Sequence, residues 1–269
     1  MKKVILVTGA SSGIGFATAN KLASMKHIVY GSSRNPEQVK DVMFQPVKMD
    51  VTDDESVKKV IDQIINTEKR IDVLINNAGN GISGPAYAMP DEMAKKQVEV
   101  NFFGVVRMCS AVIPHMLQQQ NGLIVNISSL AGLFGLPYQG LYSASKFAIE
   151  GYSESMRMEL RKTNVRITVV NPGDFNTHFG HNREKMDFPL QHDALSKNYQ
   201  AAVEIMEKDE KSAPGPEKIA KKLSKIVESS NPSHRYLVGQ VSQTMVPLLK
   251  RLLPRSLFEK LLSSHYGIK

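Results

Sequence analysis

Short apolar segments recur along the chain, and longer segments with helical periodicity separate them. The apolar segments are rich in β-branched residues, and their nearly continuous apolarity is typical of strands covered on both faces of a sheet. They predict strands over residues 4–7, 28–30, 47–49, 73–75, 124–127 and 167–170. The longer segments predict helices over residues 14–25, 55–67, 91–116 and 142–162.

Strands that alternate with helices form parallel βαβ units, and the right-handed crossover rule stacks such units into a doubly wound sheet. We therefore expect an α/β fold: a single Rossmann-like domain over residues 1–269, with helices on both faces of a parallel sheet. No repeat or linker divides the chain. The segment SAPGP at residues 212–216 predicts a loop before a further helix.

Composition supports a globular protein in a reducing compartment. Hydrophobic residues make up 42% and charged residues 22% of the chain, which is enough for a buried core. The single cysteine, Cys109, cannot form an intramolecular disulfide, and its neighbours predict an apolar helix face. The first apolar run meets Thr8 and Gly9 before it reaches the length of a signal peptide or a membrane span. We therefore expect a cytoplasmic protein.

The net charge of +8 raises the question of an anionic partner. Lys and Arg number 34 against 26 Asp and Glu, and such a balance can attract nucleic acid, anionic lipid or phosphorylated ligands. No motif that combines basic and aromatic residues accompanies the charge. The sequence therefore favours a solvated, lysine-rich surface and no nucleic-acid function.

A glycine-rich segment follows the first predicted strand. It contains Gly9, Gly13 and Gly15 in TGASSGIG and leads into a predicted helix. Glycines let the backbone approach a pyrophosphate closely, and the free N–H groups of a helix N-terminus attract its charge. The spacing differs from GxGxxG, so a structural turn is the alternative.

TGASSGIG resembles the loop TGxxxGxG of the short-chain dehydrogenase/reductase family. The resemblance implies that the three glycines bind a dinucleotide together with Ser11, Ser12 and Ile14. It extends to KMDVTD, where Asp50, beside Val51, would accept a hydrogen bond from the adenine amino group.

The family's NNAG segment follows the fourth predicted strand, and it includes Asn77, Ala78 and Gly79. The resemblance assigns these residues to the cofactor site, and a tight structural turn is the alternative. The family's PGxxxT pattern is present as Pro172, Gly173 and Thr177 after the sixth strand, where it would wrap the nicotinamide. The resemblance covers residues 3–177 strongly and the rest in outline.

The residues after the second strand favour NADP(H) over NAD(H). They form the segment YGSSRNP, which has no carboxylate to bind the ribose 2′-hydroxyl and repel a 2′-phosphate. By resemblance, Ser33 occupies the acidic position of NAD-preferring members and Arg34 the basic position of NADP-preferring ones. An ordinary loop arginine is the alternative, but a guanidinium matches phosphate geometry well.

Tyr142 and Lys146 are the predicted catalytic pair. They are four residues apart, so a helix places them on one face, one turn apart, where the ammonium would favour the phenolate of Tyr142. By resemblance, Lys146 also holds the nicotinamide ribose, Ser129 holds the substrate oxygen, and Asn101 holds a water for proton relay at a helix irregularity. Ser128 is the competitor of Ser129, with a backbone-bonding role as its alternative.

The segment after Thr177 is the expected substrate lid, at about residues 174–212, since ligands of such sheets bind beyond the carboxyl ends of the strands. An apolar substrate and packing within the lid explain its apolar residues equally well. Two histidines in the lid, His178 and His181, lack further ligands at metal spacing, so we expect no metal. The apolar residues are Phe175, Phe179, Met186, Phe188 and Leu190.

The tail at about residues 244–269 is basic and amphipathic. It has five basic residues against one acid, and Pro247 and Pro254 divide it into short helical pieces. Such a segment could cover a lipid-like substrate, lie peripherally on a membrane or contact another subunit, and it is too broken to span a bilayer. By resemblance it fits enzymes of steroids, retinoids or keto-lipids.

We therefore expect an NADP(H)-dependent oxidoreductase that interconverts an alcohol and a ketone or aldehyde on a hydrophobic substrate. The resemblance also implies a homodimer or homotetramer. A 3-ketoacyl-carrier-protein reductase is the alternative enzyme. A dinucleotide-sensing regulator is the alternative without catalysis, although it would not need Ser129, Tyr142 and Lys146 together.

Overall fold

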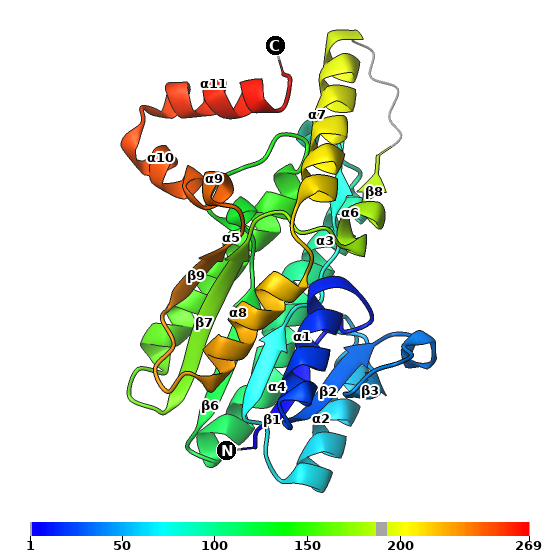
Figure 1. Ribbon diagram of the computed structural model, residues 1–269, viewed down its shortest axis with the longest axis vertical. Coiled ribbons are helices and arrows are strands. Elements are labelled where there is room, and N and C mark those ends of the chain that lie inside the picture. Colours follow the sequence, from blue (N-terminus) through cyan, green and yellow to red (C-terminus); the bar gives the residue numbers. More distant parts are fainter. Residues whose placement is uncertain (1, 187–192, 269) are drawn as a thin grey trace.

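Seven parallel strands form the central sheet of the computed structural model, which describes residues 2–186 and 193–268 (Figure 1). The β-branched segments predicted from the sequence supply six of these strands, and the expected doubly wound α/β fold is confirmed. In spatial order the strands are β3 (Gln45–Lys48), β2 (Ile28–Ser33), β1 (Val4–Val7), β4 (Val73–Asn76), β6 (Gly122–Ile127), β7 (Val165–Pro172) and β9 (Arg235–Val238).

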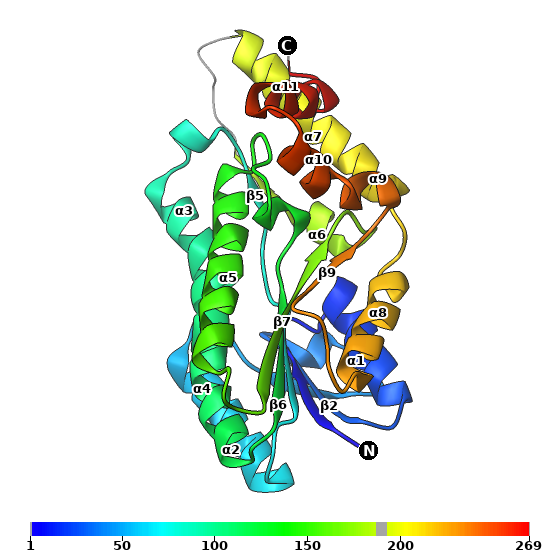
Figure 2. The ribbon, with the colours of Figure 1, turned by 90° about the vertical axis from the view of Figure 1, so that its left-hand side faces the viewer.

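Helices cover both faces of this sheet, as Figure 2 shows in a view nearly along its plane. On one face, Ile5, Val7 and Ile75 of the strands pack in a cluster with Leu22 and Leu223. That face carries α1 (Gly13–Ser24) and α8 (Glu217–Glu228), so the helix expected after residues 212–216 is present. The other face carries α2 (Asp54–Glu68), α4 (Gly104–Gln118) and α5 (Gly140–Glu159).

The helix expected over residues 91–116 is interrupted. It consists of α3 (Asp91–Val98), a π-helical turn η3 (Glu99–Phe103) and α4. By length and composition this run could cross a membrane, but Met108, Cys109 and Val112 lie fully buried against the sheet, as expected for the core helix of a globular domain.

The edge strand β9 was not predicted, and neither was the pair β5 (Ile82–Ser83) and β8 (Glu184–Lys185). In β9 only Val238 is buried, because the strand has a neighbour on one side alone. Its short apolar run, Tyr236 to Val238, was not recognised as a strand in the sequence. Arg235 of β9 forms an ion pair with the buried carboxylate of Glu150 on α5, which ties the edge of the sheet to that helix.

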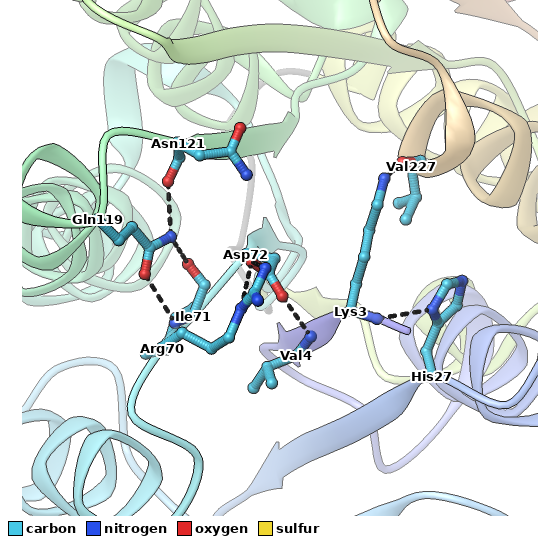
Figure 3. A network of polar contacts seen from close by, with 9 residues as sticks. All are labelled: Lys3, Val4, His27, Arg70, Ile71, Asp72, Gln119, Asn121 and Val227. Carbon is cyan, nitrogen blue, oxygen red and sulfur yellow. Dashed lines mark hydrogen bonds and ion pairs between the residues drawn. The ribbon is translucent and has the colours of Figure 1, made fainter. Parts of the chain in front are cut away.

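Polar contacts join β1, β4 and the end of α4 at the amino end of the sheet (Figure 3). The N–H of Val4 donates to Asp72 Oδ2 at 2.8 Å, and Arg70 Nε donates to Asp72 Oδ1 at 2.8 Å. The Gln119 amide donates to the Ile71 carbonyl at 2.7 Å. These contacts stabilise the end of the sheet that lies opposite the cleft described below.

The expected lid and tail both lie beyond the carboxyl ends of the strands (Figures 1 and 2). Phe258 of the tail packs with Leu130 and Phe134, which follow β6. Two of the apolar lid residues, Phe188 and Leu190, fall outside the described residues. The lid contains α6 (His178–His181) and α7 (Asp193–Ser212). The short helix α9 (Val241–Thr244) ends where the tail begins, and the tail contains α10 (Val246–Leu252) and α11 (Arg255–His265). Single turns are η1 (Pro36–Gln38), η2 (Ala86–Ala88) and η4 (Leu130–Gly132).

Candidate active site

A cleft of about 1080 Å³ runs across the carboxyl ends of the strands. Residues of the glycine loop, the end of β2, the ends of β4 and β6, α5 and the lid and tail all line it. Among the predicted site residues, only Gly15 and Asn101 do not reach its surface. The sequence segments that carry the motifs therefore converge on one concave surface.

The glycine loop requires its glycines for backbone reasons. Gly9 and Gly13 have φ angles of +66° and +56°, a region that other residues rarely adopt. A Cβ on Gly15 would lie 2.3 Å from the Gly9 carbonyl oxygen. α1 begins at Gly13, and Gly13 and Ile14 line the cleft, so the N-terminus of this helix, where an anion is favoured, lies at the cleft wall.

NNAG holds this loop in place. The Asn77 side chain donates to the Thr8 and Gly9 carbonyl oxygens at 2.9 and 3.1 Å. The hydroxyl of Thr8 accepts from the N–H groups of Asn77 and Ala78, both at 2.9 Å. The structural interpretation of NNAG therefore applies to Asn77, while Asn77, Ala78 and Gly79 also line the cleft. Sequence reasoning missed the role of Thr8.

The adenosine end of the cleft is formed by the residues after β2 and β3. Ser33 is partly exposed and its hydroxyl accepts from the Asn35 N–H at 3.2 Å, whereas Arg34 is exposed to solvent. Asp50 Oδ1 accepts from the Thr52 N–H and hydroxyl at 2.9 and 2.8 Å. The end of β2 carries no carboxylate, whereas Asp50 follows the neighbouring strand β3.

Tyr142, Ser129 and Lys146 meet where β6 and α5 face each other. Ser129 hydrogen bonds the Tyr142 hydroxyl, and Lys146 Nζ lies 5.7 Å from the centre of the Tyr142 ring. Lys146 Nζ donates to the Ile127 carbonyl oxygen at 3.0 Å. The competitor Ser128 instead lies 3.4 Å from the Lys146 carbonyl oxygen, which agrees with a backbone-bonding role.

Burial sets the protonation of this pair. It raises the pKa of Tyr142 to about 12, against the lowering effects of the Ser129 hydrogen bond and the Arg183 charge. It also lowers the pKa of Lys146 to about 8. In the protein alone, desolvation of the Tyr142 phenolate therefore outweighs the nearby positive charge, so the neighbouring ammonium by itself does not bring the pKa of Tyr142 below its usual value.

Asn101 lies in the π-helical turn, at the irregularity that the resemblance implied. Its Oδ1 accepts from the Asn80 N–H at 2.8 Å, and its Nδ2 donates to Ser145 Oγ at 3.1 Å. Ser145 in turn donates to the Tyr142 carbonyl oxygen at 2.7 Å. Asn101 is thus joined through Ser145 to α5, the helix that carries Tyr142 and Lys146. Sequence reasoning did not single out Ser145.

The turn after β7 closes the cleft from the other side. Pro172 and Gly173 line it, and Thr177 caps α6, accepting from the Phe179 N–H at 3.3 Å. A Cβ on Gly13 would lie 3.3 Å from Thr177 Cβ, so this turn lies directly over the glycine loop. Within the described residues, no group of three His, Cys, Asp or Glu side chains is placed to hold a metal ion.

Several polar residues of the lid and tail reach the cleft without any motif that would have identified them. Asp174, Arg183 and Glu210 lie near enough to act electrostatically on Tyr142, and Tyr266 at the end of α11 lines the same region. The ring of Phe179 packs against Tyr142 with 5.8 Å between ring centres. The lid and tail are therefore part of the site.

Comparison with known proteins assigns the fold and site to a family. Residues 3–187 match the short chain dehydrogenase model. The chain is 42% identical over 268 residues to a 3-ketodihydrosphingosine reductase of Bacteroides thetaiotaomicron, with 99% of both chains covered. The chain belongs to the short-chain dehydrogenase family.

Two further relatives agree with this assignment. A 3-oxoacyl-acyl-carrier-protein reductase of Thermotoga maritima is 36% identical over 204 residues, which cover 72% of this chain and 82% of the relative. The crystal structure of a short-chain dehydrogenase from Streptomyces avermitilis has a TM-score of 0.82 at 29% identity and covers 97% of this chain and 96% of its own. As a family member, the protein is an oxidoreductase of carbonyl or hydroxyl groups that uses a nicotinamide dinucleotide.

Proposed function

We propose that this protein is an NADP(H)-dependent reductase of long-chain keto-lipids. The observation that carries the proposal is the convergence of Tyr142, Ser129 and Lys146 in a cleft whose walls also contain the glycine loop, Arg34 and a group of apolar side chains. A regulator that only senses a dinucleotide would have no use for that convergence.

The cleft fits a dinucleotide. A Cβ at Gly15 would collide with backbone, and the positive φ of Gly9 and Gly13 turns the chain so that N–H groups at the start of α1 can meet a pyrophosphate. Arg34 would pair with the 2′-phosphate of NADP(H), since it is exposed at the cleft and makes no hydrogen bond or ion pair with the described residues. Ser33 would donate to the same phosphate.

The proposed chemistry follows from the positions of the polar groups. When bound, the reduced nicotinamide supplies a hydride to the carbonyl carbon of the ketone. Ser129 donates a hydrogen bond to the carbonyl oxygen, and Tyr142 transfers its hydroxyl proton to that oxygen, which yields the secondary alcohol. Lys146 holds the ribose hydroxyls and favours the remaining phenolate, and Asn101 with Ser145 supports the return of the proton.

Apolar residues support a lipid substrate. The cleft is lined near Tyr142 by side chains from the loop after β6 and from the tail, which would cover an alkyl chain. The reductase of Bacteroides thetaiotaomicron, by its name, acts on a long-chain ketone of this kind. The apolar lining residues are Leu130, Phe134, Leu136, Val246 and Leu262.

Cofactor choice tests the nucleotide half of the proposal. Arg34→Ala removes a charge-assisted hydrogen bond of about 1.5–3 kcal/mol, so NADPH binding should weaken roughly ten- to a hundredfold while NADH binding hardly changes. Ser33→Asp combined with Arg34→Ala should go further, because a carboxylate repels the phosphate and accepts from the ribose hydroxyl. The measurement is the ratio of kcat/KM for NADPH over NADH at fixed ionic strength.

Lys40→Ala is the matched control, since it removes an exposed positive charge from the same loop without lining the cleft. Its ratio should stay near that of the parent. A parent that prefers NADH, or an unchanged ratio in Arg34→Ala, would contradict the assignment.

Substrate choice separates the enzyme alternatives. A long-chain keto-lipid should be reduced with a higher kcat/KM than a 3-ketoacyl thioester, followed by NADPH absorbance. The reverse order would favour a 3-ketoacyl-carrier-protein reductase, which the relative in Thermotoga maritima represents. Binding of NADPH without reduction of any ketone would favour a sensor.

We also propose that the tail lies on the surface of an anionic membrane, where such substrates reside. Lys250, Arg251, Arg255 and Lys260 accompany leucines whose side chains are exposed. Sedimentation with phosphatidylserine liposomes at low salt should carry the protein down, and Leu252→Ser with Leu261→Ser should prevent it. Equal sedimentation of the parent and the variant would contradict membrane binding through the tail. The exposed leucines are Leu248, Leu249, Leu252, Leu257 and Leu261.

The cytoplasmic location and the homodimer or homotetramer stay predictions.

A further inference from the structure

A group of charged side chains lies beside Tyr142 in a part of the cleft that the proposed chemistry does not use. This charged cluster consists of Asp174 after β7, Arg183 after α6, and Asp209 and Glu210 on α7, and all four line the cleft. Phe179 packs against the Tyr142 ring, and a Cβ on the next residue, Gly180, would meet the Glu210 carboxylate, so the cluster lies beside the place proposed for the reacting ketone.

Arg183 has hydrogen-bond donors that lack an acceptor in the part of the chain that the structure describes. Its side chain is only 2% exposed, and one nitrogen, Nη2, pairs with the carboxylate of Glu210. Its Nε and Nη1 are buried and have no hydrogen-bond partner among the described residues. A buried guanidinium N–H without an acceptor is unfavourable. Because Arg183 also lines the cleft, an acceptor oxygen on a bound ligand would satisfy these donors once the guanidinium turns toward it.

The carboxylates outnumber the guanidinium by three to one. Glu210 is paired with Arg183, Asp209 lies 3.0 Å from the ring of His265, and Asp174 accepts from the neutral amide of Gln243. Asp174 thus has no cation of its own within hydrogen-bond distance. The excess negative charge disfavours a carboxylate or phosphate on the ligand and favours a cationic group.

A ligand head that carries an ammonium and a hydroxyl satisfies both requirements. An ammonium donates to carboxylates, whereas a hydroxyl oxygen accepts from a guanidinium and adds no charge. Both groups would lie close to the ketone, since Phe179 contacts the Tyr142 ring and its neighbour Gly180 lies against Glu210 of the cluster.

We propose that the charged cluster is a subsite for the amino-alcohol head of a keto-lipid, with Asp174 bound to its ammonium and Arg183 donating to its hydroxyl. The proposal rests on the keto-lipid reductase function proposed above and names the substrate class as long-chain amino ketones. In this arrangement the apolar side chains of the lid and tail cover the alkyl chain of the substrate, and Asp174 and Arg183 select its head group.

Three substrates test the subsite: 3-ketodihydrosphingosine, its analogue without the amine and its analogue without the hydroxyl. In Asp174→Asn, the preference for the full substrate over the amine-free analogue, measured as a ratio of kcat/KM, should fall about ten- to a hundredfold. In Arg183→Lys, which keeps the charge near Glu210, the preference over the hydroxyl-free analogue should fall about tenfold. Each variant is thus matched to one group of the substrate.

Glu204→Gln is the control, because it removes an exposed carboxylate from α7 outside the cleft, and both ratios should stay unchanged. NADPH affinity and the thermal midpoint of each variant report on folding. A second measurement needs no variant: on the parent enzyme, dodecylamine should inhibit about tenfold more strongly than dodecanol.

The outcomes are distinguishable. Reduction of all three substrates with ratios that do not change in either variant, or equal inhibition by amine and alcohol, overturns the subsite and leaves the keto-lipid reductase intact. A parent enzyme that reduces none of the three overturns both proposals. A fall in the amine-dependent ratio of kcat/KM in Asp174→Asn and in the hydroxyl-dependent ratio in Arg183→Lys supports the subsite.

Discussion

The two ends of the cleft are built in different ways. The nucleotide end is formed by short segments that follow β1 to β4, where Gly9, Gly13 and Asn77 have backbone roles that few other residues can fill. The substrate end is formed by side chains from segments far apart in the sequence, such as Phe134, Arg183 and Tyr266. One end is thus defined by local backbone geometry and the other by tertiary contacts.

This difference teaches where specificity can change. A substitution in the glycine loop meets backbone at less than 3 Å, as at Gly15, so the loop tolerates little variation. The lid and tail are held by side-chain packing, for example of Phe258 on Phe134 with 6.0 Å between ring centres. Substitutions in the lid and tail should therefore change which substrate binds without disturbing the sheet. The predictions below test that division.

The largest effect is expected at the junction of the two ends. Tyr142→Phe removes the transferable proton and little packing, so kcat should fall about 10²- to 10⁴-fold while the Kd for NADPH stays nearly the same. Steady-state rates and a binding titration measure the two quantities. Tyr152→Phe is the control, because Tyr152 lies on the same helix but packs against Phe102 away from the cleft. A Tyr142→Phe rate within a few-fold of the parent would remove Tyr142 from the mechanism.

A smaller effect is expected at the apolar roof of the substrate end. Ending the chain after Met245 should lower kcat/KM for long-chain ketones roughly tenfold relative to short ones, which corresponds to uncovering about two methylene groups at ~0.8 kcal/mol each. The affinity for NADPH should stay unchanged. Equal losses on long and short ketones would indicate that the tail serves only packing.

A pair of point variants avoids the risk that the truncated chain does not fold. Leu262→Ser changes a residue that lines the cleft and should lower the long-chain preference. Met158→Ser changes an apolar residue of α5 that is 66% exposed and lies outside both the cleft and the tail, and it should leave that preference unchanged.

The smallest effect is a pH dependence confined to the substrate end. Burial, with the charge of Glu210, raises the pKa of Asp174 to about 6. The carboxylate that would bind an ammonium therefore exists above pH 6 and is lost as the pH falls through that value. Between pH 7 and pH 5.5 the parent kcat/KM for an amino ketone should fall about fourfold relative to the amine-free analogue.

The groups that interact with Asp174 are Arg183, Asp209 and Glu210, the Gln243 amide and the hydroxyls of Tyr142 and Tyr266. Asp174→Asn should abolish the relative fall, because it removes the titrating group. Parallel pH profiles for the two ketones in the parent enzyme would show that Asp174 does not contact the amine.

Much of the fold and of the nucleotide end could be predicted from the sequence. Five strands were evident because strands buried on both faces, such as Val73–Asn76, must be apolar throughout. The edge strand β3 is mostly exposed and was predicted from the buried residues Val47 and Met49. The glycines were evident because a positive φ leaves few choices of residue. Tyr142 and Lys146 were paired because a four-residue spacing brings side chains together on any helix.

Tertiary structure alone decided the rest. The place of β9 at the edge of the sheet, beside β7, was not evident from its short apolar run, Tyr236 to Val238. The direction of the Tyr142 pKa depends on how completely neighbouring segments exclude water, which no local motif encodes. Arg183 meets Asp174 and Glu210 only because the lid folds over the carboxyl ends of the strands. Local backbone demands can be recognised in a sequence, whereas burial and charge arise from segments that meet only in the folded chain.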